Sequence, residues 1–422
     1  MKTFKVLVVL LSWMMVFLPL SLPRIAEGQD SFPPQRPPDA PTGFDNATNG
    51  LVDQATHDAD RSVFKQNETA AVGLGPTFNG VSCDSCHSIP VTGGISTVTE
   101  LRAGHLDANG NFVAATAFVN HGTEPIPERS LINLKATCPE AQEQLLPVDN
   151  IRVLRLTTNL LGAGFVEAIS DATLENIRQG QPADMQGQRI IVPALEGGSG
   201  SGRFGWKDQH VSLLSFASDA YLNEIGISNR LVPNRHDFTH QCEDVAQFPD
   251  QADPEDVQPG KDDIDVFARF MRATKAPPRD EQLASTAAAR RGSDTFTNIG
   301  CDTCHVRFID TAPPGSPMAN GDPVPDALGN KRIYPFSDFL LHNIGTGDGI
   351  VQTDQQNTRN KVRTAPLWGL RTHQVFLHDG SAATIQDAIQ RHGGQAASTV
   401  VSFNTTLTST QQQDLITFLM SL

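Results

Sequence analysis

Apolar residues recur at helical spacing in two short segments, one in the second half of the chain and one at the C-terminus. In residues 262–272 the positions that follow the spacing i, i+3, i+4, i+7 are Ile264, Phe267, Ala268 and Met271. The C-terminus repeats this spacing with Leu415, Phe418, Leu419 and Leu422. Because this spacing places apolar side chains on one face of a helix, we predict an amphipathic helix in each segment.

Each predicted helix closes a stretch of chain with the same layout. A polar helical segment comes first, then Cys-x-x-Cys-His, then a long irregular region, then the amphipathic helix. The pair Pro277-Pro278 falls between the two stretches and marks a boundary. The layout predicts one duplicated unit, with halves at residues 61–276 and 279–422, of which the first has the longer irregular region.

The N-terminus has the pattern of a secretory signal. Lys2 and Lys5 precede an apolar run at residues 6–22, and small residues follow up to Gly28. We predict that residues 1–28 are removed on export to the periplasm and that no membrane span remains. The alternative is an uncleaved anchor, because the apolar run is near the shortest length that spans a bilayer. Residues 29–60 begin with a proline-rich stretch that favours an extended tether.

Charge and cysteine spacing narrow the function classes. The 422 residues contain 47 Asp and Glu against 32 Lys and Arg, for a net charge of −15. Such a chain is a poor partner for nucleic acid, although it could dock a basic protein. Four of the six cysteines lie in two short pairs, which favours cofactor attachment over a disulfide framework. The other two, Cys138 and Cys242, could form a disulfide in an exported protein or stay as buried thiols.

Cys-x-x-Cys-His is the attachment signature of c-type haem, and it occurs at residues 83–87 and 301–305. Two cysteines three apart lie on one face of a helical turn and can bind both vinyl groups of a haem, while the adjacent histidine can bind the iron. A redox dithiol or a zinc site is the alternative, but no second Cys-x-x-Cys stands at the spacing of a zinc ribbon. We predict two covalently bound haems c, held by Cys83, Cys86 and His87 and by Cys301, Cys304 and His305.

Further motifs follow the second Cys-x-x-Cys-His in a characteristic order. They are Arg-Thr-x-Pro-Leu-Trp-Gly-Leu at 363–370, Phe-Leu-His-Asp-Gly at 376–380 and Ala-Thr-Ile-x-Asp-Ala-Ile at 383–389. This order resembles the bacterial diheme cytochrome c peroxidase superfamily. Motifs at residues 75–87, 162–169, 202–207 and 339–345 resemble its diheme oxidoreductase branch, whose members are named peroxidases or thiol oxidoreductases. The resemblance implies a mainly α fold of two cytochrome-c-like haem domains in tandem, the first with a long insertion.

The resemblance also implies two unlike haems, one with two protein ligands and one with an open or openable position for peroxide. In the peroxidases the distal ligand of the second haem lies fourteen residues after the histidine of the aromatic-His-x-Gly motif, and here that count leads from His378 to His392. We therefore predict that His305 and His392 both bind the second iron; a surface histidine is the alternative. An internal offset of 211 residues, between residues 172–176 and 383–387, leads back from His392 to Gln181 in the first half. Glutamine is a poor iron ligand, which suggests that the His87 haem is the open one. The alternative is that another histidine of the first half reaches this iron, from the set His57, His105, His121, His210, His236 and His240.

Peroxide cleavage needs a group that takes a proton from one oxygen and returns it to the other. A carboxylate in an apolar pocket suits this role, because desolvation raises its pKa. Glu167 stands in an apolar run and is the first prediction; its alternative is a salt bridge to a core arginine such as Arg155. Glu175 is the second prediction, because it aligns with the catalytic glutamate of the peroxidases; its alternative is an acid in the first turn of a helix.

Other residues follow from the same resemblance. Trp206 and Trp368 are the two candidates for an indole between the haems, each with a core role as the alternative. Arg363 and His342 match positions near the second haem, where propionates need partners. Calcium is in doubt, because His-Gln-Val at residues 373–375 replaces the Thr-x-Pro whose backbone oxygens help to hold it in the peroxidases.

The predicted function is that of a periplasmic diheme peroxidase-type oxidoreductase. Electrons pass from the C-terminal low-spin haem to the N-terminal active-site haem. The predicted partners are hydrogen peroxide and an external electron donor such as a small cytochrome or a cupredoxin. The alternatives are a non-catalytic diheme electron-transfer cytochrome and a haem-based redox or partner-binding module.

Overall fold

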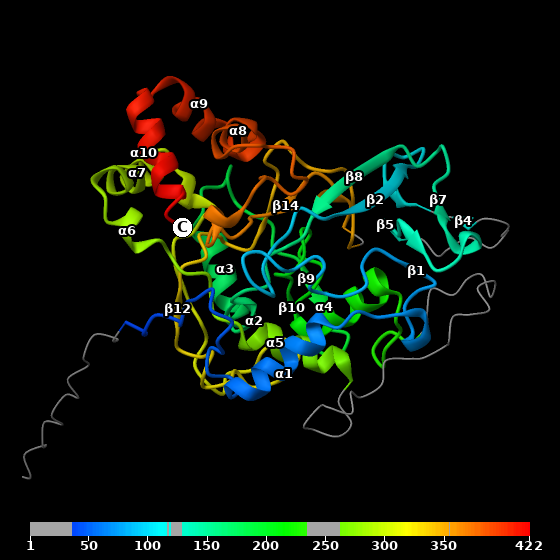
Figure 1. Cartoon of the computed structure of the whole chain (residues 1–422). Coiled ribbons are helices and arrows are strands. Elements are labelled where there is room, and N and C mark those ends of the chain that lie inside the picture. The colour runs from blue at the N-terminus through cyan, green and yellow to red at the C-terminus, as the bar shows by residue number, and fades with distance from the viewer. Residues whose placement is uncertain (1–35, 116–117, 120–128, 234–261, 354) are drawn as a thin grey trace, which may run out of the picture. The chain divides into compact units, whose positions relative to one another are not determined.

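A computed structural model describes residues 36–115, 118–119, 129–233, 262–353 and 355–422 (Figure 1). Contacts join residues 37–422 into a single unit. The predicted signal peptide and Cys242 lie outside the described residues. None of the helices in the described part is long and apolar enough to cross a membrane.

Much of the predicted tether is bound to the folded unit. The backbone amide of Ala40 donates to the carbonyl of Arg332 at 2.8 Å, and that of Asn49 donates to the carbonyl of Ala273 at 2.8 Å. Helix α1 also begins inside the predicted range, at Gln54. The prolines keep this backbone extended, and the amides between them remain free to pair with other strands. Residues 37–60 therefore belong to the folded unit.

Three helices surround the first Cys-x-x-Cys-His motif. Helices α1 (Gln54–Lys65) and α4 (Leu213–Ala220) both contact α5 (Asp263–Ala273). Helix α5 confirms the prediction at residues 262–272: a capping box of Asp262 and Asp265 starts it, and its predicted apolar positions are buried. The same core includes residues of α2 (Ala163–Glu167) and α3 (Asp171–Gly180). Helix α4 continues into a π-helical turn at Tyr221–Ile225.

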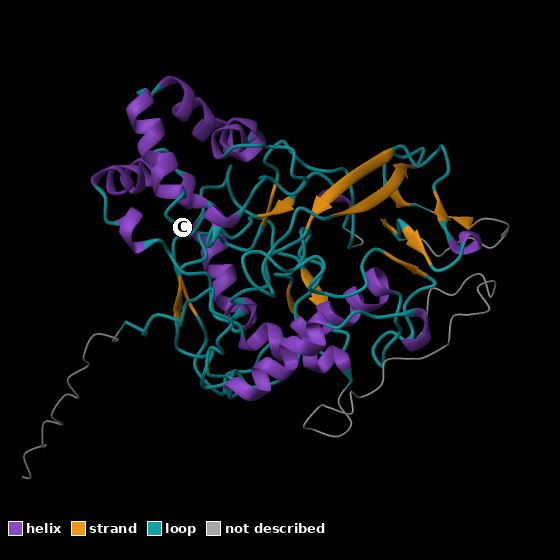
Figure 2. Ribbon diagram, viewed as in Figure 1, coloured by secondary structure: helices purple, strands orange, loops and turns teal. Residues whose placement is uncertain are grey.

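The segment between the first Cys-x-x-Cys-His motif and α2 folds into an antiparallel sheet. Strand β2 (Thr99–Leu106) is central and pairs with β3 (Phe112–Ala114), β5 (Leu131–Ile132) and β8 (Ile151–Leu156). Figure 2 shows β2 and β8 as the longest strands of this sheet. The mainly α prediction therefore describes the helices around the two motifs and misses this sheet. Neither β2 nor β8 alternates strictly between apolar and polar residues, so no period-2 run indicated a sheet.

The second half pairs α7 (Ala287–Asn298) with α10 (Ser409–Leu419), beside α8 (Ile385–Arg391) and α9 (Ala397–Thr405) (Figure 1). The predicted C-terminal helix is confirmed, and its apolar residues share a core with Phe296 of α7. Leu422 lies past the helix end but in the same core. Each half thus sets a pair of contacting helices beside its Cys-x-x-Cys-His motif.

Short elements complete the described residues. Five two-stranded pairs are β1 (Thr77–Phe78) with β6 (Lys135–Ala136), β4 (Phe118–Val119) with β7 (Glu143–Gln144), β9 (Ile191–Pro193) with β10 (Ser199–Ser201), β11 (Ile309–Asp310) with β12 (Arg332–Ile333), and β13 (Leu341–His342) with β14 (Val362–Arg363). The short helices are α6 (Glu281–Ala284) and 3-10 turns at Ala70–Val72, Pro139–Ala141, Cys301–Thr303, Gln356–Thr358, Leu370–Thr372 and Gly394–Ala396.

Candidate active site and cofactor pockets

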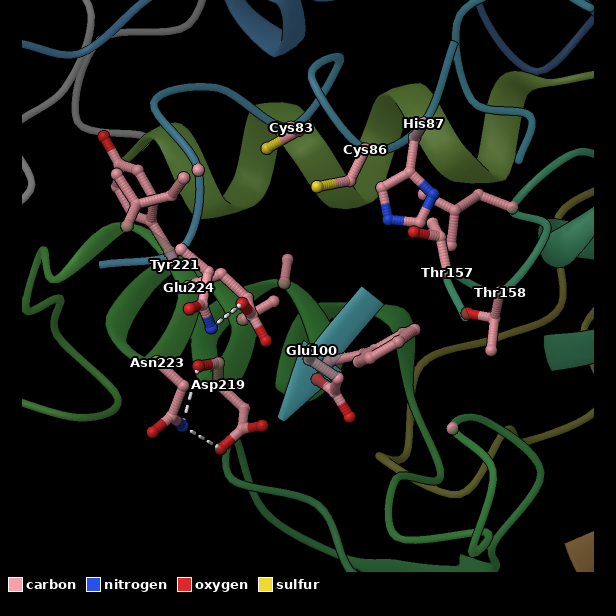
Figure 3. A pocket seen from close by; sticks show the side chains of 18 of the residues that line it. Cys83, Cys86, His87, Glu100, Thr157, Thr158, Asp219, Tyr221, Asn223 and Glu224 are labelled. Atoms are coloured by element: carbon pink, nitrogen blue, oxygen red, sulfur yellow. Dashed lines mark hydrogen bonds between the residues drawn. The ribbon is translucent and has the colours of Figure 1, made fainter. Parts of the chain in front are cut away.

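The first Cys-x-x-Cys-His motif forms one wall of a large cavity. The backbone amides of Cys86 and His87 both donate to the carbonyl of Cys83 at 3.1 Å, so the motif makes one tight turn. This turn brings the two thiols and the imidazole to the same side, as Figure 3 shows. The hollow encloses about 1180 Å³ of space free of protein atoms, counted together with the solvent at its open mouth.

The second motif lines a cavity of its own, with about 1650 Å³ of empty space. Cys301, Cys304 and His305 all border it, and the amide of His305 donates to the carbonyl of Cys301 at 3.0 Å. His392, at the C-terminal end of α8, borders the same cavity. The structure therefore brings the two predicted ligands of the second iron to one pocket.

The three predicted iron ligands share one orientation. In each of them the Nδ1 atom lies within hydrogen-bond distance of a backbone carbonyl oxygen. The distances are 3.1 Å from His87 to Gly94, 2.9 Å from His305 to Phe336, and 2.7 Å from His392 to Ala388. Burial lowers the pKa of His87 and of His305 to about 4, so both imidazoles are neutral. A neutral ring that donates Nδ1–H to a carbonyl keeps Nε2 free, and metal-binding histidines are typically held in this way. These two pockets, each with two thiols and a free Nε2, fit haem.

Trp206 borders both cavities. Its Nε1–H donates to the carbonyl of Leu156 at 2.8 Å, and its ring meets the ring of His378 edge to face at a centroid distance of 6.0 Å. Trp368 lies in the hydrophobic core of the first half instead. Of the two predicted bridging indoles, Trp206 is the one placed between the pockets.

The second pocket also receives the two predicted propionate partners, Arg363 and His342. The Nε–H of Arg363 donates to the carbonyl of Gly205 at 2.8 Å, and Nε2 of His342 lies 2.8 Å from Oδ2 of Asp338. Cys304, Asp338 and His342 are also the one cluster of possible metal ligands within the described residues. Calcium prefers oxygen ligands, so this cluster does not suit it, and calcium binding stays a prediction.

Glu167 is buried, but it lies in an ion pair and not on the wall of the first pocket. Its carboxylate accepts two hydrogen bonds from the guanidinium of Arg272, at 2.6 and 2.9 Å, and one from the amide of Leu213 at 2.8 Å. The predicted alternative was a salt bridge to a core arginine, and Arg272 takes the place that Arg155 was expected to fill. The catalytic role of Glu167 stays a prediction that these contacts do not favour.

Glu175 is partly exposed on α3, also away from the pocket. It pairs with Arg178 at 2.7 Å and with Arg189 at 3.1 Å. The hydrogen bond from Arg178 is the main cause that lowers the pKa of Glu175 to about 2. An acid this strong is a poor proton donor near neutral pH.

Gln181 is the position of the first half that matches His392. Its side-chain amide donates to Asp338 at 2.6 Å, so it lies beside residues of the second half.

Three other carboxylates border the first pocket, Glu100, Asp219 and Glu224, and sequence reasoning missed all of them. Glu224 lies in the π-helical turn and Glu100 on β2, and they face Cys86 and His87 across the cavity in Figure 3. Asn79 donates its side-chain amide to Glu224 at 2.8 Å. Burial and the nearby charge of Glu100 raise the pKa of Glu224 to about 8. Most of its neighbours in sequence are apolar, but Asn223 directly precedes it, so its signal was weaker than the one that singled out Glu167.

Cys138 is in a disulfide, as predicted for an exported chain. The predicted partner, Cys242, lies outside the described residues. The four motif cysteines are free thiols, which is the form that haem attachment requires.

The two pockets define a protein that binds two haems. Residues 135–422 match the family described as "Di-haem oxidoreductase, putative peroxidase", and the chain belongs to this family. No curated protein matches the chain significantly.

Two solved structures are similar over most of their length. Hydrazine synthase of Kuenenia stuttgartiensis, pressurised with xenon, is 15% identical with a TM-score of 0.38, and the match covers 95% of this chain and 100% of that one. A MauG-like protein associated with microbial copper homeostasis is 16% identical with a TM-score of 0.40, over 93% and 94% of the two chains. Values this low do not define a shared fold or a shared reaction.

Proposed function

We propose that this protein is a periplasmic c-type diheme oxidoreductase that reduces hydrogen peroxide at its first pocket. The observation that carries the proposal is the asymmetry of the two pockets. The second pocket presents both His305 and His392, whereas His87 is the one histidine among the described residues that line the first. Carboxyl groups line the first pocket, and none of the described residues brings a second histidine to it. This supports one closed haem that passes electrons and one open haem that reacts.

The chain's own residues have distinct roles in this proposal. Cys83 and Cys86, like Cys301 and Cys304, hold a haem covalently, and the bound haem supplies an iron at which peroxide is reduced. Glu224 is placed to exchange protons with the two peroxide oxygens, and its raised pKa keeps that exchange within reach of neutral pH. Apolar neighbours such as Phe267 and Met271 exclude water from the same cavity.

Electrons would enter at the second pocket and reach the first through Trp206. The net charge of −15 would favour a basic electron donor, such as a small cytochrome or a cupredoxin. Trp206→Phe should slow electron transfer between the haems several-fold and leave both haems bound. The measurement is stopped-flow absorption after peroxide is mixed with protein reduced by one electron. Trp368→Phe is the matched control, because that indole lies in the core, and an equal effect of both variants would remove Trp206 from the path.

Low-temperature EPR of the holoprotein tests the function as a whole, in the oxidised state and after reduction by one electron. We expect a low-spin signal from the second haem and, in at least one redox state, a high-spin signal from the first that disappears on addition of peroxide. His392→Ala should convert the low-spin signal to a high-spin one and so assign the two haems. Two low-spin signals that stay unchanged on addition of peroxide, in both redox states, would show instead a diheme protein that only carries electrons.

A further inference from the structure

A buried aspartate, Asp348, connects the two chain segments that meet at Trp206. The indole is tied to β8 by the hydrogen bond from its Nε1–H to the carbonyl of Leu156. Lys207, the residue after Trp206, places Nζ 2.8 Å from Oδ1 of Asp348. Arg155, the residue before Leu156, donates its Nε–H to Oδ2 of the same aspartate at 2.8 Å. These links close a ring of five residues, which we call the Asp348 ring.

The three charged side chains of the Asp348 ring are closed off from solvent. The side chain of Asp348 is 0% exposed, and those of Arg155 and Lys207 are each 1% exposed. Burial raises the pKa of Asp348, but the charges of Arg155 and Lys207 more than offset this and lower it to about 2. Asp348 is therefore ionised at neutral pH. Because water does not reach the site, this carboxylate is the group that keeps the two cations together.

The backbone of Trp206 is held from another side by the segment that leads into β14. Arg363 of β14 donates its amide to the carbonyl of Trp206 at 2.9 Å. Nζ of Lys207 donates to the carbonyl of Lys361 at 2.6 Å and to that of Arg359 at 3.0 Å, just before the same strand. Lys207 therefore links this segment to the aspartate, and the aspartate links it to β8.

We propose that Asp348 is the positioning residue that fixes the indole of Trp206 between the two haem pockets. The proposal rests on the proposed function, in which electrons pass through this indole. Such transfer depends on the distance and orientation of the ring relative to each haem, so a ring that moves or turns passes electrons more slowly. One electron passes from the second pocket to the first, and the Asp348 ring gains or loses neither an electron nor a proton overall.

Asp348→Asn in the holoprotein tests this proposal. The amide keeps the shape of the carboxylate but not its charge, so Arg155 and Lys207 are left facing each other without an acid between them. We expect the ultraviolet resonance Raman signal of the Trp206 indole N–H to shift, because the hydrogen bond to Leu156 is weakened. Its absence in Trp206→Phe assigns this signal. Electron transfer between the haems, measured by the same stopped-flow experiment, should slow several-fold, as in Trp206→Phe.

Two further variants separate position from folding and from charge. Lys207→Met opens the ring but leaves Arg155 and Asp348 as a pair, so it keeps the test decisive if Asp348→Asn does not fold. It should shift the Raman signal and slow the transfer in the same way. Asp348→Asn combined with Lys207→Met opens the ring as well, but it leaves one net positive charge there, as in the wild type. The double variant should be as slow as Asp348→Asn.

Asp60→Asn is the matched control. Asp60 is also a buried partner of an arginine, Arg269, with a side chain that is 2% exposed, and it lines neither haem pocket. Its substitution should leave both the Raman signal of Trp206 and the transfer rate as in the wild type.

Three outcomes decide between the possibilities. A Raman signal and a transfer rate that stay at wild-type values in Asp348→Asn and in Lys207→Met would overturn the inference. Recovery of the wild-type rate in the double variant would also overturn it, because the ring would then act through its charge alone. A shifted Raman signal with an unchanged transfer rate would keep Asp348 as the residue that positions the indole and would reject the path through Trp206 in the proposed function.

Discussion

Glu224→Gln should lower the rate of peroxide reduction by about 10²–10⁴-fold, the usual contribution of a general acid–base group. Glutamine can still accept the hydrogen bond from Asn79, so the shape of the pocket is retained, but it has no proton to exchange. The rate is measured by steady-state consumption of peroxide with a reduced electron donor. Haem content and the EPR signals should be unchanged, which separates a lost proton from a lost cofactor.

Two matched variants serve as controls for the Glu224→Gln result. Glu175→Gln removes a carboxylate that is ion-paired outside the pocket, and it should retain near wild-type turnover. Glu167→Gln should retain turnover per folded molecule as well, because Glu167 faces Arg272 and Leu213. If Glu167→Gln were inactive and Glu224→Gln active, the assignment of the proton-exchanging group would return to the motif at residues 162–169.

Arg272→Met should lower the free energy of unfolding by about 3–5 kcal/mol, because it leaves the carboxylate of Glu167 buried without its partner. The side chain of Glu167 is only 2% exposed, so solvent cannot take the place of the guanidinium. The measurement is urea unfolding of the holoprotein at pH 7. Arg178→Met is the control, since its pair with Glu175 is 28% and 26% exposed and should change the free energy of unfolding far less.

The double variant Arg272→Met with Glu167→Leu should recover most of the lost stability, because no buried charge is then left unpaired. A loss below about 1 kcal/mol in Arg272→Met alone would show that the ion pair does not hold Glu167. In that case Glu167 would again be a candidate for the proton-exchanging group.

Local patterns predicted much of the scaffold. The spacing of apolar residues found α5 and the C-terminal helix, because one helical face depends only on residues within a few turns of each other. The Cys-x-x-Cys-His motifs found both pockets, since all the atoms that attach one haem come from a single turn. His392 was found through a resemblance, and the structure places it beside His305.

The acid–base group could not be found in this way. Glu167 and Glu224 both have apolar neighbours in sequence, and nothing in either segment shows whether an arginine or a cavity will face the carboxylate. Arg272 reaches Glu167 from 105 positions away, and Glu224 borders the same pocket as the distant His87. The same distance effect hid the sheet around β2, whose longest pairing is with β8, far along the chain.

The sequence by itself located the two Cys-x-x-Cys-His turns, predicted a helix beside each of them and indicated the family. These depend on bonds and contacts between residues close in sequence. Only the tertiary structure decided that Trp206 and not Trp368 lies between the pockets, that Glu167 is ion-paired with Arg272, and that Glu224 borders the first pocket. A carboxylate's role depends on its desolvation and on the charges within a few ångströms, and in this chain those charges come from distant segments.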